Sequence, residues 1–240
     1  MSVHINDLPN EILCHLLKFL PKKTLFQIEI VCQKWKYCVR KLLLEIRVLE
    51  DIVYWKNDAG EYMDAPNLES ILIKCQNINK LCLGHTTLES NSLVTIAKLC
   101  PQLEQINFCF TADLRCSDDE LEEFGKLIGP QLKYCNLFFL EDDRLITIFL
   151  KHLTNVEEIK FYIYAQKIKQ IKELFFNLNN SCDQLKTLEW LPFGISPMKK
   201  CIFTHENFIQ VHQKINHLSI NLYHLYYFQQ IDLSNLTELT

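Results

Sequence analysis

Ile78-Asn79-Lys80-Leu81-Cys82-Leu83 is the first of a series of short apolar signatures that decide the fold. The pattern places apolar residues at its first, fourth and sixth positions, and it returns at Leu103, Leu132, Val156, Leu185, Ile215 and, incompletely, Leu236. Successive signatures start 25, 29, 24, 29, 30 and 21 residues apart. Within each signature, the alternation of apolar and polar residues is typical of a short strand with one buried face. We therefore predict one strand in each of these similar units.

Apolar residues at helical spacing fill the intervals between the signatures. Examples are Leu93, Ile96 and Ala97 in one interval, and Leu121, Phe124, Leu127 and Ile128 in the next. A strand followed by a helix, repeated at this period, predicts an α/β fold, a solenoid with parallel strands inside and helices outside. In this period residues 67–240 resemble the leucine-rich-repeat proteins. Because the signature at Leu236 is incomplete, we expect the array either to be truncated or to have its last layer covered by a partner.

The first 50 residues follow a different pattern, that of short amphipathic helices. Pro9 suits the first turn of the first helix, and Pro21 suits its end. The apolar stripe of that helix comprises Ile12, Leu13, Leu16, Leu17 and Leu20. We expect Thr24 to cap a second helix and a third helix to run from Trp35 to Ile46. Three helices in about 45 residues give a core of marginal stability, so we expect a partner or the next domain to complete this module.

Four short motifs in this module occur in a characteristic order. They are Leu8-Pro9-Asn10-Glu11-Ile12-Leu13, Phe19-Leu20-Pro21, Thr24-Leu25 and Val31-Cys32-Gln33-Lys34-Trp35. With these motifs, residues 3–49 resemble the F-box. A polar connecting segment follows over residues 50–66. The family's usual Leu-Trp near the end of the box is replaced here by Leu42-Leu43-Leu44-Glu45-Ile46.

The resemblance implies a partner and a binding surface. In the F-box family the helices bind the Skp-family adaptor of a cullin-RING ubiquitin ligase, so the same adaptor is the implied partner here. Carried over position by position, the implied adaptor-binding residues are Leu8, Pro9, Ile12, Leu16, Leu20, Pro21, Leu25, Val31, Cys32 and Trp35. A small amphipathic module that exposes Leu, Pro and Trp also has the composition of a helix-mediated interface. The competing interpretation is that these side chains form only the module's own core.

A second surface follows from strand geometry. If the later apolar residues of each signature point inward, the residues beside and between them face outward. The outward positions that we predict to face a target protein are Tyr134, Asn136, Phe138, Glu158, Lys160, Tyr162, Glu189 and His217. Aromatic residues within a field of mixed charge suit a protein partner better than a polyanion. The alternative is that these residues are simply the exposed side of a sheet.

Small residues recur at the corner before each strand. Cys75, Cys100 and Cys182 each stand three residues before a signature, and Gly129 holds the same place before Leu132. The need for a small buried side chain explains the residues at this position. The recurring cysteines also resemble those of the cysteine-containing leucine-rich repeats that follow F-boxes. A catalytic thiol is the competing hypothesis, but no cysteine has an evident His and Asn or Asp context. We therefore expect the cysteines to be structural.

Composition excludes several other classes of protein. With 25 basic and 29 acidic residues and a net charge of −4, the chain lacks the basic excess of a duplex-binding protein. Its 5 glycines form no phosphate-binding loop, and its 11 cysteines include no CxxC pair. The acidic runs Asp118-Asp119-Glu120 and Glu141-Asp142-Asp143 each precede a helical stripe, so we interpret them as helix caps and not as metal ligands. We expect no cofactor and no metal.

These observations predict a non-catalytic protein of the cytoplasm or nucleus. No signal peptide is recognisable, and no run approaches the ~20 apolar residues of a membrane span. We expect a substrate-recognition subunit of an SCF-type ubiquitin ligase, whose F-box binds the adaptor and whose repeats bind the target. The alternative is an adaptor-bound scaffold that has no degradation target. Co-purification of cullin with the adaptor would distinguish the two.

Overall fold

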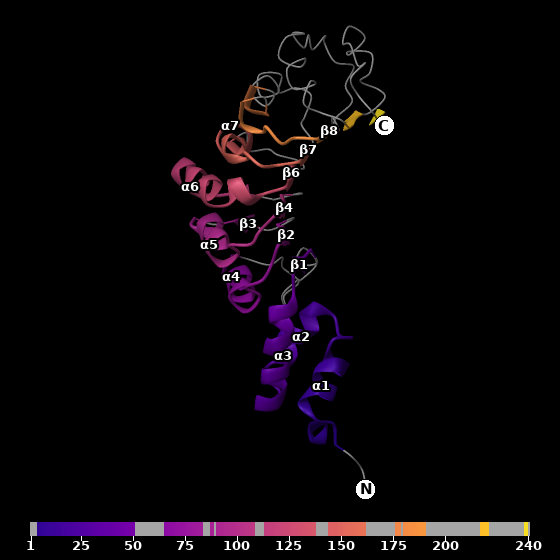
Figure 1. Ribbon diagram of the computed structural model, residues 1–240. Helices are drawn as coiled ribbons and strands as arrows, with labels where there is room; N and C mark the ends of the chain where they lie inside the picture. Colours follow the sequence, from indigo (N-terminus) through magenta and orange to yellow (C-terminus); the bar gives the residue numbers. More distant parts are fainter. Residues whose placement is uncertain are drawn as a thin grey trace, which may run out of the picture.

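A computed structural model describes residues 4–50, 65–83, 87–88, 90–108, 113–137, 144–161, 176–178, 180–190, 217–220 and 238–239. Its N-terminal part consists of helices, which lie at one end of the molecule (Figure 1). A 3-10 turn, η1 (Ile5–Asp7), precedes α1 (Asn10–Leu17), α2 (Lys22–Ile28) and α3 (Gln33–Glu45). The predicted three helices are therefore present, but the first ends at Leu17, before Leu20 and Pro21, where it was expected to end.

The two prolines set the starts of the first two helices. Pro9 and Pro21 each occupy the N-cap position, immediately before the first residue of α1 and of α2. The prediction that Thr24 caps the second helix is wrong, because α2 already begins at Lys22. Proline fixes its own φ near the helical value and has no N–H to leave unpaired, so it starts the helix three residues earlier than the threonine would.

All strands of the main sheet are parallel, and their spatial order is their order in the chain. The strands are β1 (Val48–Leu49), β2 (Lys80–Cys82), β4 (Gln105–Asn107), β6 (Tyr134–Leu137), β7 (Glu158–Phe161), β8 (Thr187–Trp190), β9 (His217–Ile220) and β10 (Glu238–Leu239). A second sheet pairs β3 (Thr87–Leu88) with β5 (Asp113–Leu114). Each unit thus adds one strand beside the strand of the unit before it.

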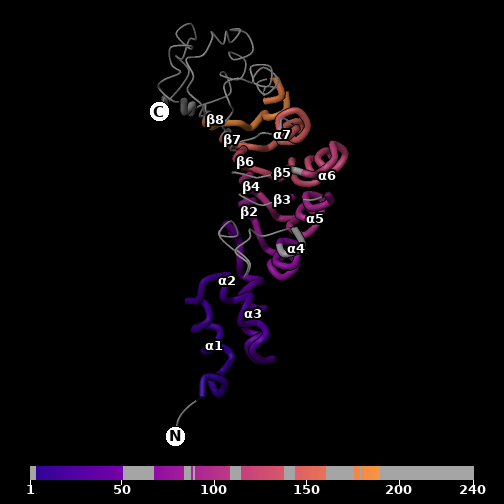
Figure 2. Tube along the Cα trace, turned by 180° about the vertical axis from the view of Figure 1, so that it is seen from behind, coloured from indigo at the N-terminus to yellow at the C-terminus, as the bar shows by residue number. Residues whose placement is uncertain are grey.

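Helices cover one side of the main sheet. They are α4 (Ala65–Lys74), α5 (Ser92–Leu99), α6 (Asp118–Ile128) and α7 (Arg144–Thr147), with the 3-10 turns η3 (Gly129–Gln131) and η4 (Phe149–His152). Figures 1 and 2, seen from opposite sides, show these helices stacked in chain order along the row of strands. The predicted α/β fold is confirmed: a helical N-terminal part precedes a parallel sheet with a repeat-like arrangement.

A regular backbone ladder holds successive units in register. In the steps from β1 to β8, the carbonyl oxygen before a strand accepts two N–H groups from the next unit, at 2.8–3.1 Å. For example, the carbonyl of Glu104 accepts from Lys133 and Tyr134, and the carbonyl of Lys133 accepts from Glu157 and Glu158. The accepting carbonyls belong to Arg47, Asn79, Glu104, Lys133 and Glu157. Because the same bonds recur at each step, the strand starts are aligned whatever the length of the unit.

The apolar signatures form the core, as the alternation predicts. All three signature residues are buried in the units that start at Ile78, Leu103 and Leu132. Behind them, Phe108, Phe124 and Phe149 pack together from two successive units, with ring centroids 5.3–6.3 Å apart. Leu127 departs from the predicted helical stripe: it is exposed on α6, while Phe124 and Ile128 on either side of it are buried.

The corner position is tightly filled. Cys75, Cys100 and Cys182 are fully buried immediately after a helix, and the carbonyls of Cys100, Gly129 and Cys182 each accept the N–H of the first signature residue that follows. At Gly129 a β-carbon would lie 2.4 Å from the backbone oxygen of His152. A small residue is therefore required at Gly129, because the neighbouring chain passes where a side chain would stand.

The N-terminal helices are joined directly to the sheet. β1 follows α3 after two residues and pairs with β2 as the first strand, so the sheet begins inside the segment predicted as the first module. Side chains reinforce this junction. Lys22 Nζ donates to the carbonyl of Val48 at 2.9 Å, and Asn77 Nδ2 donates to the carbonyl of Leu44 at 2.8 Å. Leu49 is buried in the same core as the signatures.

Candidate partner-binding surfaces

The first helix exposes an apolar stripe to solvent. Ile12, Leu16 and Phe19 are 49%, 45% and 76% exposed, while Leu13 and Leu17 of the same helix are buried. The predicted stripe therefore divides into two: one side forms the core and the other faces outward. Ile30 and Val31, just after α2, are also exposed, at 90% and 56%. Apolar side chains gathered in this way on a small helical module are typical of a protein interface.

Trp35 fixes the N-terminal turn beside this stripe. Its indole Nε1 donates to Asn6 Oδ1 at 2.8 Å, and the neighbouring Lys34 Nζ donates to the backbone oxygen of Asn6 at 2.8 Å. The turn is closed by a reciprocal pair of hydrogen bonds between His4 and Asp7. Trp35 is half-buried against the core, so it positions the turn as well as presenting part of its ring to solvent.

The predicted adaptor-binding residues differ in exposure. Pro9, Ile12, Leu16, Pro21 and Val31 are exposed, and Leu8, Leu20, Cys32 and Trp35 are half-buried. Leu25 lies in the core, where it supports the surface from beneath. Sequence reasoning missed three exposed residues of the same region, namely Ile5, Phe19 and Ile30. Phe19 could have been found, because it belongs to the Phe19-Leu20-Pro21 motif and lies in the turn just after α1.

Comparison with known proteins assigns the helical part. Residues 5–47 match the family model of the F-box domain. They form an F-box. Within the stretch that replaces the family's usual Leu-Trp, residues 42–46, Leu42 and Leu43 are buried in the core.

Other comparisons bear on the whole chain. A solved structure titled as the Rad7 and Elc1 complex in yeast contains a chain with 15% sequence identity and a TM-score of 0.47. The match covers 96% of the present chain, which spans only 66% of the length of that one. No curated protein sequence matches.

The outward face of the sheet forms the second surface. Parallel register aligns Gln105, Tyr134, Glu158 and Thr187 in one row. It aligns Asn107, Asn136, Lys160 and Glu189 in the next row. Of the residues predicted to face a target, Tyr134, Asn136, Glu158, Lys160 and Glu189 therefore share one face. Phe138, Tyr162 and the side chain of His217 lie outside the described residues.

Charged groups on this face are paired across the strands. Lys160 Nζ lies 2.7 Å from a carboxylate oxygen of Glu189 and 3.5 Å from one of Glu158. The hydrogen bond to Glu189 raises the pKa of Lys160, so the ammonium is firmly charged. Burial raises the pKa of Tyr134 to about 12, so its phenol remains neutral. Further toward the F-box, Lys80 on β2 pairs with Glu50.

A separate row of ion pairs follows the edge where each strand begins. Lys133 and Glu104 are 2.6 Å apart, and Lys186 and Glu157 are 2.6 Å apart. All four side chains are 41–58% exposed, so each pair contributes little to stability. These residues belong to the turn before the strand and not to the outward face.

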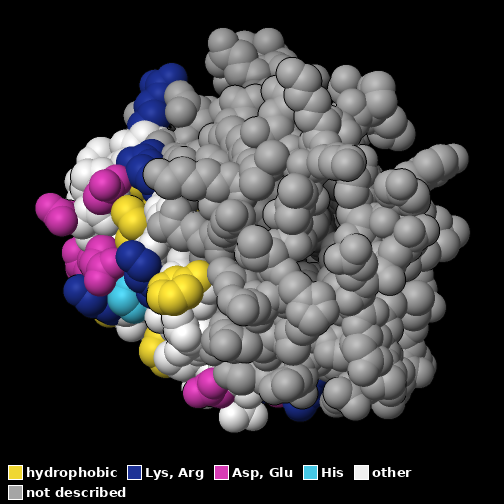
Figure 3. All heavy atoms as spheres, turned by 90° about the horizontal axis from the view of Figure 1, so that it is seen from above, with side chains coloured by type: hydrophobic (Ala, Val, Ile, Leu, Met, Phe, Trp, Pro, Cys, Tyr) yellow, Lys and Arg dark blue, Asp and Glu magenta, His cyan; other side chains and the backbone are white. Residues whose placement is uncertain are grey.

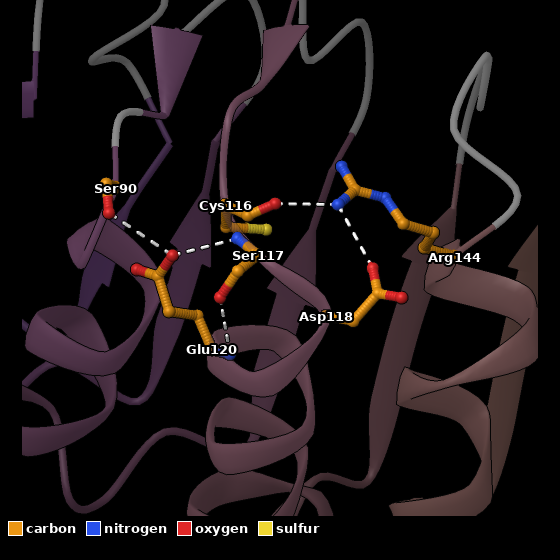
Figure 4. Close-up of polar contacts among 6 residues, drawn as sticks. All are labelled: Ser90, Cys116, Ser117, Asp118, Glu120 and Arg144. Carbon is orange, nitrogen blue, oxygen red and sulfur yellow. Dashed lines mark hydrogen bonds and ion pairs between the residues drawn. The ribbon is translucent and has the colours of Figure 1, made fainter.

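Polar contacts also tie the helix starts together, as Figure 4 shows. The side chain of Ser117 accepts from the N–H of Glu120, and the Glu120 carboxylate accepts in return from the N–H of Ser117 at 2.8 Å. The same carboxylate accepts from Ser90 at 3.3 Å and from the N–H of Asn91. Arg144 Nη1 donates to the carbonyl of Cys116 at 2.6 Å. The capping role predicted for Asp118-Asp119-Glu120 is thus confirmed, whereas Glu141-Asp142-Asp143 lies outside the described residues.

The described thiols have the properties of core residues. Burial raises the pKa of Cys75 and of Cys100 to about 12, and it also raises the pKa of Cys135. In the F-box, burial and a contact with Cys14 raise the pKa of Cys38 to about 11. A nucleophile must ionise readily, so these four cysteines are poor candidates for thiol chemistry.

The described surface has no other feature that suggests a small-ligand site. Seen from above in Figure 3, positive and negative side chains are interspersed over the described part of that face. Among the described residues, no group of three or more His, Cys, Asp or Glu side chains could hold a metal ion. No helix within the described ranges has the length and apolar character to cross a membrane.

Proposed function

We propose that the chain is a substrate-recognition subunit of an SCF-type cullin-RING ubiquitin ligase, in which the F-box binds the Skp-family adaptor. The exposed stripe of Ile12, Leu16 and Phe19 carries this proposal. Burying an apolar side chain of this size contributes about 1.5–3 kcal/mol, so the isolated chain leaves a substantial binding energy unused. Ile12 and Leu16 lie one turn apart on α1, a spacing by which an amphipathic helix docks in a partner's groove, and Phe19 follows in the turn after the helix.

In this proposal residues 67–240 are leucine-rich repeats that form a solenoid and hold the target protein. Three observations support it: the strands run parallel in chain order, the signatures are buried at equivalent places, and the same carbonyl ladder recurs between units. The face that carries Tyr134, Glu158, Lys160 and Glu189 is the proposed target-binding surface. Its mixed charge and aromatic content favour a protein partner.

The proposed mechanism is tethering. The F-box holds the chain on the ligase, and the sheet holds the target, so the target is at high effective concentration near the ubiquitin-charged enzyme. The residues of this chain bind and orient, and the conjugation chemistry belongs to other subunits. Cysteines without a disulfide framework suit a reducing compartment, so the proposed location is the cytoplasm or nucleus.

A matched pair of variants tests the adaptor interface. Leu16 on α1 and Leu127 on α6 are both leucines on helices, with exposed fractions of 45% and 46%. We expect Leu16→Glu to abolish co-purification with a Skp-family adaptor, because it introduces a charge into the apolar stripe. Leu127→Glu adds the same charge far from the F-box and is expected to leave co-purification intact.

Equal co-purification of both variants with the adaptor would contradict the proposal. Circular dichroism of each variant separates lost binding from lost folding. The presence of cullin in the wild-type complex, together with a protein that accumulates when the chain is removed, would distinguish a substrate receptor from a scaffold without a degradation target.

A further inference from the structure

Two carboxylates and one ammonium lie together on the outward face of β6, β7 and β8. Glu158 and Glu189 share the single ammonium of Lys160, which leaves one carboxylate charge in excess. Glu189 takes the shorter contact, so Glu158 is the carboxylate with more capacity for a further donor. This face therefore suits a partner that brings donors and positive charge.

An aromatic ring lies directly beside the available carboxylate. Tyr134 and Glu158 are register partners on adjacent strands, so their side chains emerge next to each other on the same face. Tyr134 is half-buried, which holds its ring in place, and Glu158 is 37% exposed. A planar guanidinium can donate two parallel hydrogen bonds to a carboxylate and stack on an aromatic ring at the same time. The ammonium of a lysine has neither the two parallel N–H donors nor the flat surface of a guanidinium.

We propose that the face formed by Tyr134, Glu158, Lys160 and Glu189 binds an arginine-bearing segment of a partner protein. The guanidinium lies against the Tyr134 ring and donates to Glu158, while Lys160 stays bound to Glu189. The excess carboxylate disfavours a polyanion, whose phosphates would be repelled. This inference rests on the proposed function, because it specifies the chemistry of the protein that the sheet would hold.

Peptide binding to the full chain tests the proposal. The probe is an array of short arginine-containing peptides, each beside a copy in which citrulline replaces arginine. Citrulline keeps the size and planarity of arginine but removes its charge. We expect a subset of arginine peptides to bind and their citrulline copies to bind about tenfold more weakly, the loss for one charge-assisted hydrogen bond. Glu158→Gln should weaken the same peptides by a similar factor.

The matched control is Glu157→Gln, which removes the adjacent carboxylate of the edge pair with Lys186. It should change peptide binding by less than about twofold, because that pair is exposed and lies off the face. Equal loss in the two variants would show general charge attraction and overturn the proposal, as would equal binding of arginine and citrulline peptides or the absence of arginine binders. Adaptor co-purification, which reports on the F-box alone, is expected to be unchanged in Glu158→Gln. Failure of adaptor binding would thus be distinguishable from failure at this face.

Discussion

Glu29, just after the second F-box helix, accepts a hydrogen bond from Lys74 of α4 at 2.5 Å. Its other carboxylate oxygen accepts from Arg40 Nε of α3 at 2.9 Å. The Glu29 side chain is only 7% exposed, so this carboxylate is a buried link between the F-box and the first helix of the sheet domain. Burial alone would raise the pKa of Glu29, but the hydrogen bonds from Lys74 and Arg40 outweigh it and the pKa is lowered.

Removal of this charge is expected to destabilise the junction. Glu29→Gln should lower the free energy of unfolding by about 1–3 kcal/mol, because two charge-assisted hydrogen bonds are weakened in a buried place. Urea denaturation measures the effect. The control is Glu45→Gln, which breaks the half-exposed pair of Glu45 with Lys18 and should cost less than about 1 kcal/mol. Equal losses in the two variants would mean that the junction adds nothing beyond a surface ion pair.

The same carboxylate predicts a pH dependence. The folded-state pKa of Glu29 lies below its ordinary value, so its contribution is complete above the unfolded-state pKa and is lost as the pH falls through the folded-state pKa. We therefore expect the stability difference between wild type and Glu29→Gln to be constant near neutral pH and to shrink in acid. Urea titrations at a series of pH values measure it. A difference that persists unchanged at strongly acidic pH would refute this assignment.

The close packing at Gly129 predicts that alanine destabilises the protein more there than at Gly125. A β-carbon at Gly129 would meet the backbone oxygen of His152 at 2.4 Å, whereas at Gly125 it would meet the side-chain ring of His152 at 2.5 Å. Backbone cannot move aside as easily as a side chain, so Gly129→Ala should cost about 1–3 kcal/mol. Gly125→Ala should cost less, because the His152 ring can rotate and alanine favours the α6 helix by about 1 kcal/mol. Thermal unfolding of the two variants measures both losses of stability. A larger loss for Gly125→Ala than for Gly129→Ala would contradict the prediction.

The buried thiols predict slow chemical modification. Cys75 and Cys100 are fully buried and their pKa values are raised to about 12, so neither accessibility nor ionisation favours attack on a reagent. We expect both to react with iodoacetamide much more slowly in the native protein than in urea, while the half-buried Cys32 reacts at an intermediate rate. Peptide mass spectrometry after timed labelling resolves each site. Rapid native labelling at either corner would restore the hypothesis of a reactive thiol.

Sequence alone predicted the features that depend on short-range pattern. The buried signatures, the parallel α/β arrangement and the helix start at the acidic run Asp118-Asp119-Glu120 all follow from periodicity and local electrostatics. Contacts between segments that are distant in the chain produce no such pattern in the sequence. The bridge from Glu29 to Lys74 joins residues 45 positions apart, and β1 contains only Val48 and Leu49, too few for an alternating pattern. The sequence also did not show which apolar residues of the α1 stripe face outward, because residues that face a partner and residues that face the core are equally apolar.

The ladder of carbonyls that accepts two N–H groups at each step determines where the chain could tolerate changes in length. Strand starts are fixed by these bonds, yet the signatures they align are separated by 24 or 25 residues in some units and by 29 in others. Differences in length are therefore absorbed on the helix side. An insertion there would lengthen one loop, whereas a single residue inserted between Leu103 and Ile106 would turn polar Gln105 into the core and shift every later residue of β4 by one place.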